Sequence, residues 1–180
     1  MIGVLVSGEG TNLQALLDAE LPVVAVASNV EGVRALRRAE EAGIPTAAFP
    51  LEHYASRDER DGAMAVWLED HGVELVVCAG YMHLLRPSFL ARFPGRVVNV
   101  HPAPLPAFPG ARPLEDVLEA GAKNAAATVH YVDEGVDSGE VIASEPVPVI
   151  EGDTVETLRE RVHEAEHRLL PKVVRELCAR

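Results

Sequence analysis

Several features that would stabilise or target a protein are scarce in this sequence. Only two cysteines occur in 180 residues, Cys78 and Cys178, and neither has a second cysteine at metal-ligand spacing. Two isolated cysteines do not make a disulfide framework, so we expect reduced thiols. No apolar run approaches the ~18 residues of a membrane span, and no basic segment precedes an apolar one as in a signal peptide. We therefore expect a soluble, cytoplasmic protein without a membrane partner.

Positive charge is scarce as well. The chain has 16 Lys and Arg against 28 Asp and Glu, a formal net charge of -12. A protein that binds nucleic acid without regard to sequence needs a basic patch or stripe, so we expect no nucleic-acid partner. An anionic substrate must instead be held locally, by backbone N–H groups or by a few arginines.

The first hundred residues alternate between short apolar runs and helical patterns. Apolar runs predict buried strands, and the segments between them have helical spacing. Strands that alternate with helices imply right-handed crossovers and a parallel sheet. We therefore expect a doubly wound, Rossmann-like α/β unit with strands at 2–6, 23–27, 46–49, 74–79 and 96–100, and with helices at 31–42 and 57–71.

The pattern changes beyond residue 110. Residues 125–132 and 140–149 alternate between apolar and polar positions, which predicts an antiparallel strand pair added to a mostly parallel sheet. A short helix is expected at 113–120 before that pair. The chain then closes with a long helix at about 154–178.

The start of the closing helix has a recognisable pattern. Asp153 is the expected N-cap, with Glu156 completing a capping box. We expect a single domain over residues 1–180. Its phosphate- and substrate-binding half covers about 1–100, and about 101–180 holds the catalytic loop, the strand pair and the closing helix.

A glycine turn follows the first strand, in the segment S-G-E-G-T-N-L. Gly8 and Gly10 predict a tight turn, and a strand, a glycine turn and a helix N-terminus together form a phosphate cradle. Leu13 stands where a dinucleotide motif has its third glycine, which favours a single phosphate monoester. A tight turn without any ligand is the alternative.

The segment R-V-V-N-V-H-P-A-P-L-P-A-F-P-G, residues 96–110, is the strongest candidate for a catalytic site. Residues two apart on a strand share a face, so Asn99 and His101 project together. The loop between residues 133 and 139 carries Asp137, which can pair with His101 if it folds over the strand end. An amide, an imidazole and a carboxylate, without a serine or cysteine nucleophile, suggest direct acyl transfer. A structural role for His101 is the alternative.

A second pattern, H-E-A-E-H, points to a different chemistry. His163 and His167 lie four residues apart on the closing helix, as in zinc peptidases. A zinc site needs a third ligand, and Glu176 is the only carboxylate that follows. We therefore expect no metal, and a zinc hydrolase stays an alternative. The remaining histidines outside the loop after the fourth strand are expected to be surface or structural residues, namely His53, His71 and His130.

Together with A-G-Y-M-H-L-L after the fourth strand and H-Y-V-D-E-G-V-D-S-G, these motifs resemble the phosphoribosylglycinamide formyltransferases, folate-dependent enzymes of purine synthesis. The resemblance extends from residue 1 to about residue 175. It implies that Asn99, His101 and Asp137 are catalytic. It also implies that the backbone of Gly10, Thr11 and Asn12 holds the 5'-phosphate and that Glu166 binds the ribose hydroxyls.

The resemblance further implies 10-formyltetrahydrofolate as co-substrate, no metal and small-molecule partners only. The sequence leaves a homodimer open. The amine of phosphoribosylglycinamide would attack the formyl carbon directly. The residues implied to frame the folate lie in three segments: Arg57; Tyr81, Met82, His83, Leu84 and Leu85; and Val132, Asp133, Glu134, Gly135 and Val136.

Two features depart from the family pattern. His83 stands where an arginine is usual, and G-A-R-P at 110–113 is closer to formyltetrahydrofolate deformylases and to methionyl-tRNA formyltransferases. The deformylases are marked by an N-terminal regulatory domain and by N-x-H-H, where this sequence has N-V-H-P. The tRNA enzymes carry a domain for a polyanion, at odds with a net charge of -12. A nucleotide-binding module without turnover is a further alternative.

Overall fold

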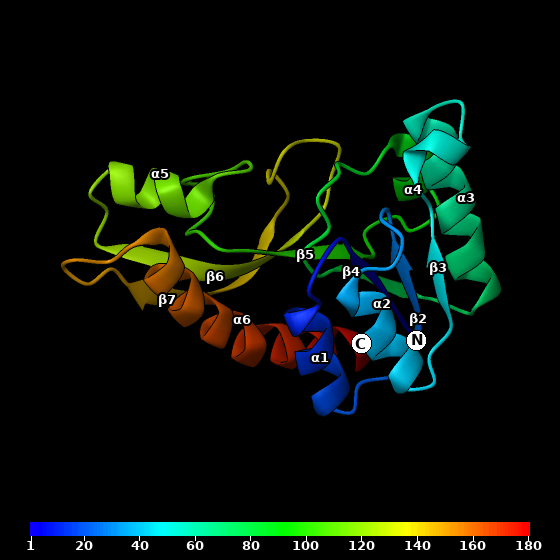
Figure 1. Cartoon of the computed structure of the whole chain (residues 1–180), viewed down its shortest axis with the longest axis horizontal. Helices are drawn as coiled ribbons and strands as arrows, with labels where there is room; N and C mark the ends of the chain where they lie inside the picture. The colour runs from blue at the N-terminus through cyan, green and yellow to red at the C-terminus, as the bar shows by residue number, and fades with distance from the viewer. The chain divides into compact units, whose positions relative to one another are not determined.

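The apolar runs form the expected strands in the computed structural model, which describes all 180 residues (Figure 1). The strands of the first half are β1 (Ile2–Val6), β2 (Val23–Ser28), β3 (Thr46–Ala48), β4 (Leu75–Cys78) and β5 (Val97–His101). Every residue of β1 is buried, which explains why its sequence is apolar without alternation. Burial also raises the pKa of Cys78 in β4 to about 12, so this thiol stays protonated.

The chain forms two compact units, Met1–Val98 and Asn99–Arg180, and the boundary falls within β5. In the first unit the strand order is β3-β2-β1-β4-β5, and β1 is parallel to both β2 and β4. The chain therefore runs outward from β1 to β3 and returns to the other side of β1. Ligands of doubly wound sheets bind at such a switch point, beyond the carboxyl ends of the strands.

Helices connect the strands of the first unit: α1 (Thr11–Asp18), α2 (Arg34–Glu41), α3 (Arg57–Asp70) and α4 (Pro87–Leu90), with a short 3-10 turn, η1, at Leu51–His53. The expected helix at 31–42 is shorter at both ends. The sequence analysis missed η1 and α4, because a single helical turn is too short to show periodicity.

In the second unit the strand order is β5-β6-β7. Strand β6 (Asn124–Tyr131) pairs antiparallel with β7 (Val141–Pro148), which confirms the added strand pair. The pairing register shifts between Val129 and His130. Such a bulge bends a strand and changes the direction of the side chains beside it. Helix α5 (Pro113–Glu119) precedes β6.

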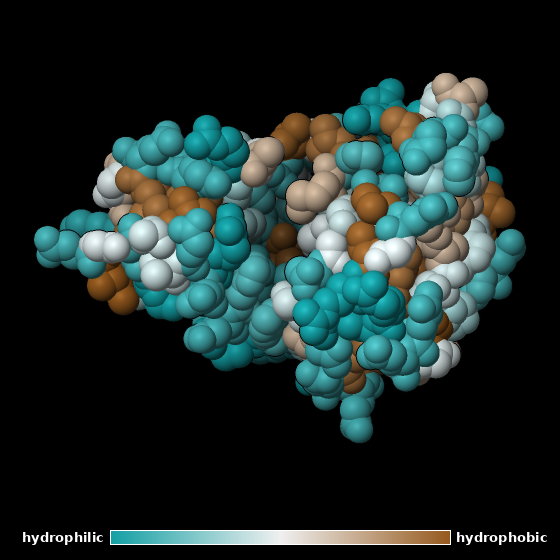
Figure 2. Space-filling view, viewed as in Figure 1, coloured by the Kyte–Doolittle hydropathy of each residue, from teal (hydrophilic) through white to brown (hydrophobic).

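Helix α6 (Val155–Cys178) closes the second unit and is amphipathic. Its buried residues include Leu158, Val162, Ala165 and Leu170, while the face turned toward the viewer in Figure 2 is mostly hydrophilic. No helix in this structure combines the length and apolarity that crossing a membrane requires.

The expected N-cap of α6 was wrong by one residue. Thr154 is the N-cap, and it exchanges hydrogen bonds with Thr157 rather than with Glu156. Asp153 instead accepts from the backbone N–H of Ile150 and pairs with Arg161. Its hydrogen bond from Arg161 is the main reason that the pKa of Asp153 is lowered to about 2. In this capping box the hydroxyl of Thr154 accepts from the N–H of Thr157, and the hydroxyl of Thr157 accepts from the N–H of Thr154.

Candidate active site

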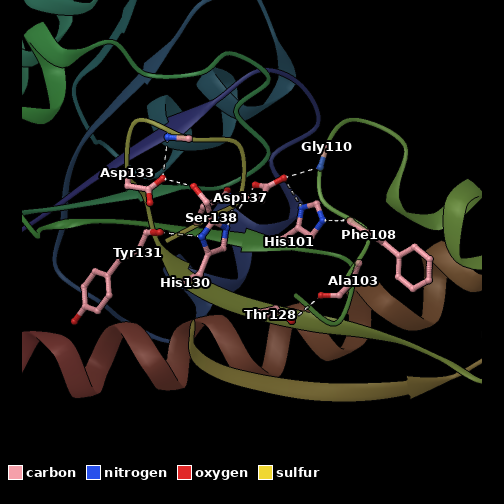
Figure 3. A network of polar contacts seen from close by, with 12 residues as sticks. His101, Ala103, Phe108, Gly110, Thr128, His130, Tyr131, Asp133, Asp137 and Ser138 are labelled. Carbon is pink, nitrogen blue, oxygen red and sulfur yellow. Dashed lines mark hydrogen bonds and ion pairs between the residues drawn. The ribbon is translucent and has the colours of Figure 1, made fainter. Parts of the chain in front are cut away.

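The three residues expected to carry the chemistry lie in the second unit, and His101 and Asp137 are seen together in Figure 3. Strand β5 contains Asn99 and ends at His101, and the loop between β6 and β7 provides Asp137. The Nδ1 atom of His101 lies 3.5 Å from an Oδ of Asp137. The loop therefore folds over the end of β5, as the sequence analysis required for this pair.

The proline-rich loop at 102–110 holds both members of the pair. The Nε2 atom of His101 lies 2.8 Å from the backbone oxygen of Phe108. A carbonyl only accepts, so Nε2 carries a hydrogen and donates. The N–H of Gly110 donates to the Asp137 carboxylate at 2.9 Å. Both the imidazole and the carboxylate are thus fixed by backbone groups of one loop.

One residue in each of these two loops has an unusual backbone conformation. Phe108 has φ of 57° and Asp137 has φ of 50°, so both residues adopt the left-handed conformation. That conformation costs roughly 1–2 kcal/mol for a residue with a Cβ atom. It persists only where surrounding contacts hold it, and such residues are concentrated at functional sites. Here those contacts include the hydrogen bonds to His101 and Gly110.

His130 is a member of this cluster that the sequence analysis missed. Its Nε2 atom lies 3.2 Å from the Nδ2 atom of Asn99 and 3.6 Å from an Oδ of Asp137. Its Nδ1 atom lies 2.9 Å from the backbone oxygen of Tyr131, so Nδ1 carries a hydrogen. The ring is only 2% exposed, and this burial lowers the pKa of His130. The neutral ring therefore accepts a hydrogen bond from the Asn99 amide.

This hydrogen bond orients Asn99. A carboxamide has two N–H groups, and one of them points at His130, which leaves the second for another acceptor. Thr128, two residues before His130, donates to the backbone oxygen of Ala103 at 2.7 Å and supports the start of the proline-rich loop. The site thus presents one directed amide N–H beside an imidazole and a carboxylate. Such a set can stabilise an oxyanion and move a proton.

The expected phosphate cradle lies in the first unit. Gly10 is the N-cap of α1, with φ of 74°, and no side chain caps this helix. Thr11 and Asn12 are the first two residues of α1, and the N–H groups at a helix N-terminus favour an anion. A Cβ atom at Gly10 would lie 2.6 Å from the Cβ atom of Ala35, so this position also requires glycine for space.

The loop after β4 holds five of the expected folate residues. Tyr81 and Leu85 are buried, whereas Met82 and Leu84 are 73% and 51% exposed. Only the middle of the loop therefore offers side chains to a ligand. The backbone N–H of Met82 donates to the Ser7 hydroxyl at 2.9 Å. This hydrogen bond links the loop to the residue that precedes the glycine turn.

His83, in the same loop, forms a hydrogen bond with the arginine of a buried ion pair. Arg60 has no exposed surface and pairs with Asp61 at 2.6 Å, and its Nη1 atom lies 3.1 Å from the Nδ1 atom of His83. Guanidinium only donates, so Nδ1 accepts and the hydrogen resides on Nε2. Burial and the charge of Arg60 lower the pKa of His83. Arg57, by contrast, is exposed at the start of α3.

The other expected ligand contacts lie in the second unit. In the loop between β6 and β7, Val132 is half-buried and the next four residues are exposed: Asp133, Glu134, Gly135 and Val136. Asp133 accepts from the Gly135 N–H and from the Ser138 hydroxyl, and these two hydrogen bonds close the loop. Glu166 lies within α6 and is 4% exposed.

The H-E-A-E-H pattern places two stacked imidazoles on α6. The rings of His163 and His167 have centroids 6.1 Å apart, and burial lowers the pKa of both. The chain contains no group of three or more histidine, cysteine, aspartate or glutamate side chains arranged to hold a metal. The two histidines therefore lack the third protein ligand that a zinc site requires.

Comparison with known proteins gives consistent matches over nearly the whole chain. The family model described as formyl transferase matches residues 1–174. The phosphoribosylglycinamide formyltransferase of Mycobacterium tuberculosis is 46% identical over 179 residues, which cover 97% of this chain and 83% of that protein. The trifunctional purine biosynthetic protein adenosine-3 of Gallus gallus is 48% identical over 94% of this chain. The chain spans only 18% of that longer protein.

Solved structures show the same similarity. The glycinamide ribonucleotide transformylase 1 of Symbiobacterium toebii superimposes with a TM-score of 0.94 at 47% identity, over 97% of this chain and 85% of that one. The phosphoribosylglycinamide formyltransferase of Streptococcus pneumoniae gives a TM-score of 0.94 at 41% identity, over 98% of this chain and 97% of that one. Neither the deformylase nor the zinc hydrolase alternative gains support from these matches.

Proposed function

The chain belongs to the formyl transferase family and, within it, to the phosphoribosylglycinamide formyltransferases, and from this premise we propose that it formylates the amine of 5'-phosphoribosylglycinamide. We propose 10-formyltetrahydrofolate as the formyl donor. The observation that supports this activity most directly is the cluster in which Asp137 lies between His101 and His130, while His130 orients Asn99. The roles proposed below use small-molecule substrates and need no metal ion.

In the proposed reaction the amine nitrogen attacks the formyl carbon, and the carbonyl oxygen becomes an oxyanion. The free N–H of Asn99 donates to this oxyanion as its negative charge develops. A protonated His101 would donate from both ring nitrogens, to Phe108 and to Asp137, and its positive charge would stabilise the same oxyanion. The tetrahedral intermediate then loses the bond from the formyl carbon to N10 of the folate.

One proton must move during this exchange. The attacking amine loses a proton, and N10 of the folate gains one when its bond to carbon breaks. We assign this transfer to His101 and Asp137, because their 3.5 Å separation leaves a proton only a short path between them. The amine attacks the formyl carbon itself, so no covalent enzyme intermediate is needed. The buried thiol of Cys78 stays protonated and is therefore not a nucleophile.

The substrate would be held at both ends. The N–H groups of Gly10, Thr11 and Asn12 would bind the 5'-phosphate, because they lie at the glycine turn and the N-terminus of α1. Glu166 would accept hydrogen bonds from the ribose hydroxyls.

The folate would lie against the two loops described above. The pterin would contact the backbone of Tyr81–Leu85 and of Val132–Val136, with Met82 and Leu84 available as apolar side chains. Arg57 would pair with the anionic tail. His83 would contribute an uncharged N–H donor rather than a positive charge, because Arg60 occupies its Nδ1 atom, and burial together with the charge of Arg60 lowers its pKa.

Steady-state kinetics of His101→Ala test the proposal. We expect turnover to fall by ~10²-fold or more while the KM of both substrates changes little, since the imidazole acts in the chemical step. His53→Ala is the matched control, because His53 is an exposed histidine in η1. Full activity of His101→Ala would refute the assignment. A matching loss in the control would show that the effect does not come from the site.

A further inference from the structure

The peptide groups of the phosphate cradle are held by α2. The backbone oxygen of Gly8 accepts from the N–H of Ala35 at 3.0 Å, and the backbone oxygen of Glu9 accepts from the Nε atom of Arg38 at 2.8 Å. One further carbonyl, that of Gly10, accepts from Gln14 N–H inside α1 at 2.9 Å. All three carbonyl oxygens of the turn therefore have a donor.

A bond to a carbonyl also sets the direction of an N–H group. In a trans peptide the C=O of one residue and the N–H of the next point in opposite directions. The bond from Arg38 to the Glu9 oxygen thus fixes the direction of the Gly10 N–H, the first of the groups proposed to bind phosphate. The peptide group turns about ψ of Glu9 and φ of Gly10, and a glycine at the second position makes this rotation easy when the bond is absent. The alternative orientation would turn a carbonyl oxygen toward a phosphate dianion.

Arg38 itself is held in place. Its Nη1 atom donates to the Oε1 atom of Gln14 at 3.1 Å, so the guanidinium bridges the turn and the first part of α1. The side chain is half-buried, and its bond to Glu9 is charge-assisted, which makes it roughly twice as strong as a neutral hydrogen bond. Ala35, one helical turn before Arg38, approaches the turn so closely that Gly10 has no room for a Cβ atom.

We propose that Arg38 is a positioning residue for the substrate phosphate, which acts by fixing the Glu9–Gly10 peptide group rather than by touching the substrate. The inference rests on the proposed function, because it takes Gly10 to Asn12 as the phosphate site. Loss of one charge-assisted hydrogen bond corresponds to about a 10- to 100-fold change in an equilibrium. The effect should fall on substrate binding and not on the chemical step.

The test is the kinetics of Arg38→Met with phosphoribosylglycinamide and with the same compound lacking its phosphate. We expect the KM of the phosphorylated substrate to rise by about 10-fold or more, with kcat within about 3-fold of wild type. The compound without phosphate should show the same kcat/KM in both proteins. Arg38→Lys keeps the charge and one donor and should recover part of the loss.

Arg37→Met is the matched control. Arg37 precedes Arg38 on α2 and is exposed, and its hydrogen bond goes to the Gly32 oxygen, away from the turn. We expect this control to behave as wild type. An equal rise in KM for Arg37→Met, or an equal loss with the compound that lacks phosphate, would overturn the proposal. So would an unchanged KM in Arg38→Met.

Calorimetric binding of ribose 5-phosphate separates this inference from the proposed function. If wild type binds ribose 5-phosphate and Arg38→Met binds it about 10-fold more weakly, the positioning role stands even when no formyl transfer is found. If Arg38→Met does not fold, the comparison of Arg38→Lys with wild type decides: equal affinity for ribose 5-phosphate overturns the inference, and weaker affinity supports it.

Discussion

Replacing His130 with phenylalanine removes the acceptor for Asn99 while keeping the strand filled. The net contribution of the lost hydrogen bond is about 0.5–1.5 kcal/mol, and this value sets the lower limit of the effect on turnover. The upper limit is the value of a complete oxyanion donor, about 2.7–4 kcal/mol, because a misdirected Asn99 can lose no more than its whole contribution. We therefore expect kcat to fall by about 10- to 100-fold, with KM values nearly unchanged.

A double-mutant cycle with Asn99→Ala shows whether His130 acts through Asn99. The two side chains are in contact, at 3.2 Å, so their effects should not add. We expect the double variant to be no slower than Asn99→Ala alone. His130→Gln restores an acceptor and should recover part of the activity. Full activity of His130→Phe, or independent losses that multiply in the double variant, would refute the reasoning.

Loss of the His130 imidazole should also change how stability depends on pH. Burial lowers the pKa of His130 in the folded protein, against the opposing effects of Tyr131 and Asp137. The unfolded chain therefore binds the proton first, so stability is complete above about pH 6.5 and falls as the pH drops toward the folded-state value. Urea unfolding between pH 5 and pH 7.5 should show a smaller loss in His130→Gln than in wild type. Because His163 and His167 also have lowered pKa values, part of the acid loss should remain.

Three further predictions concern the other parts of the site. Asp137→Asn should lose ~10²-fold or more in kcat with substrate binding retained, and unchanged turnover would contradict its role. Gly10→Ala should lower the unfolding free energy by about 2–5 kcal/mol, from left-handed strain and the contact with Ala35, and Ala35→Gly in the same chain should restore part of it. His163→Ala should stay active, and stoichiometric zinc in the purified wild type would contradict our reading of α6.

The strands were predictable because each is a short apolar run, and the parallel, doubly wound arrangement followed from their alternation with helices. The first residue of the closing helix was harder to predict. Asp153 and Thr154 are both good N-caps, and the choice between them depends on which hydroxyl or carboxylate reaches the first turn. In the folded chain Arg161 takes Asp153 as its partner, a contact between residues eight apart that local patterns do not encode.

The approach of Asp137 to His101 was predictable from loop composition and family resemblance, whereas the contact of His130 with Asn99 was not. A single histidine within an apolar strand is usually structural, and the register shift after Val129 that accompanies its inward position belongs to the pairing with β7. Arg60 was missed for a similar reason. An arginine on an amphipathic helix is normally exposed, and its burial beside Asp61 and His83 is a tertiary property.

The most direct test of the proposed activity is a spectrophotometric assay with purified protein and 10-formyltetrahydrofolate, run with and without phosphoribosylglycinamide. The account predicts tetrahydrofolate formation only when the amine is present, with one formylated product for each folate consumed. Equal folate turnover without the amine, with release of formate, would instead identify a deformylase. No turnover in either condition would contradict the transferase assignment outright.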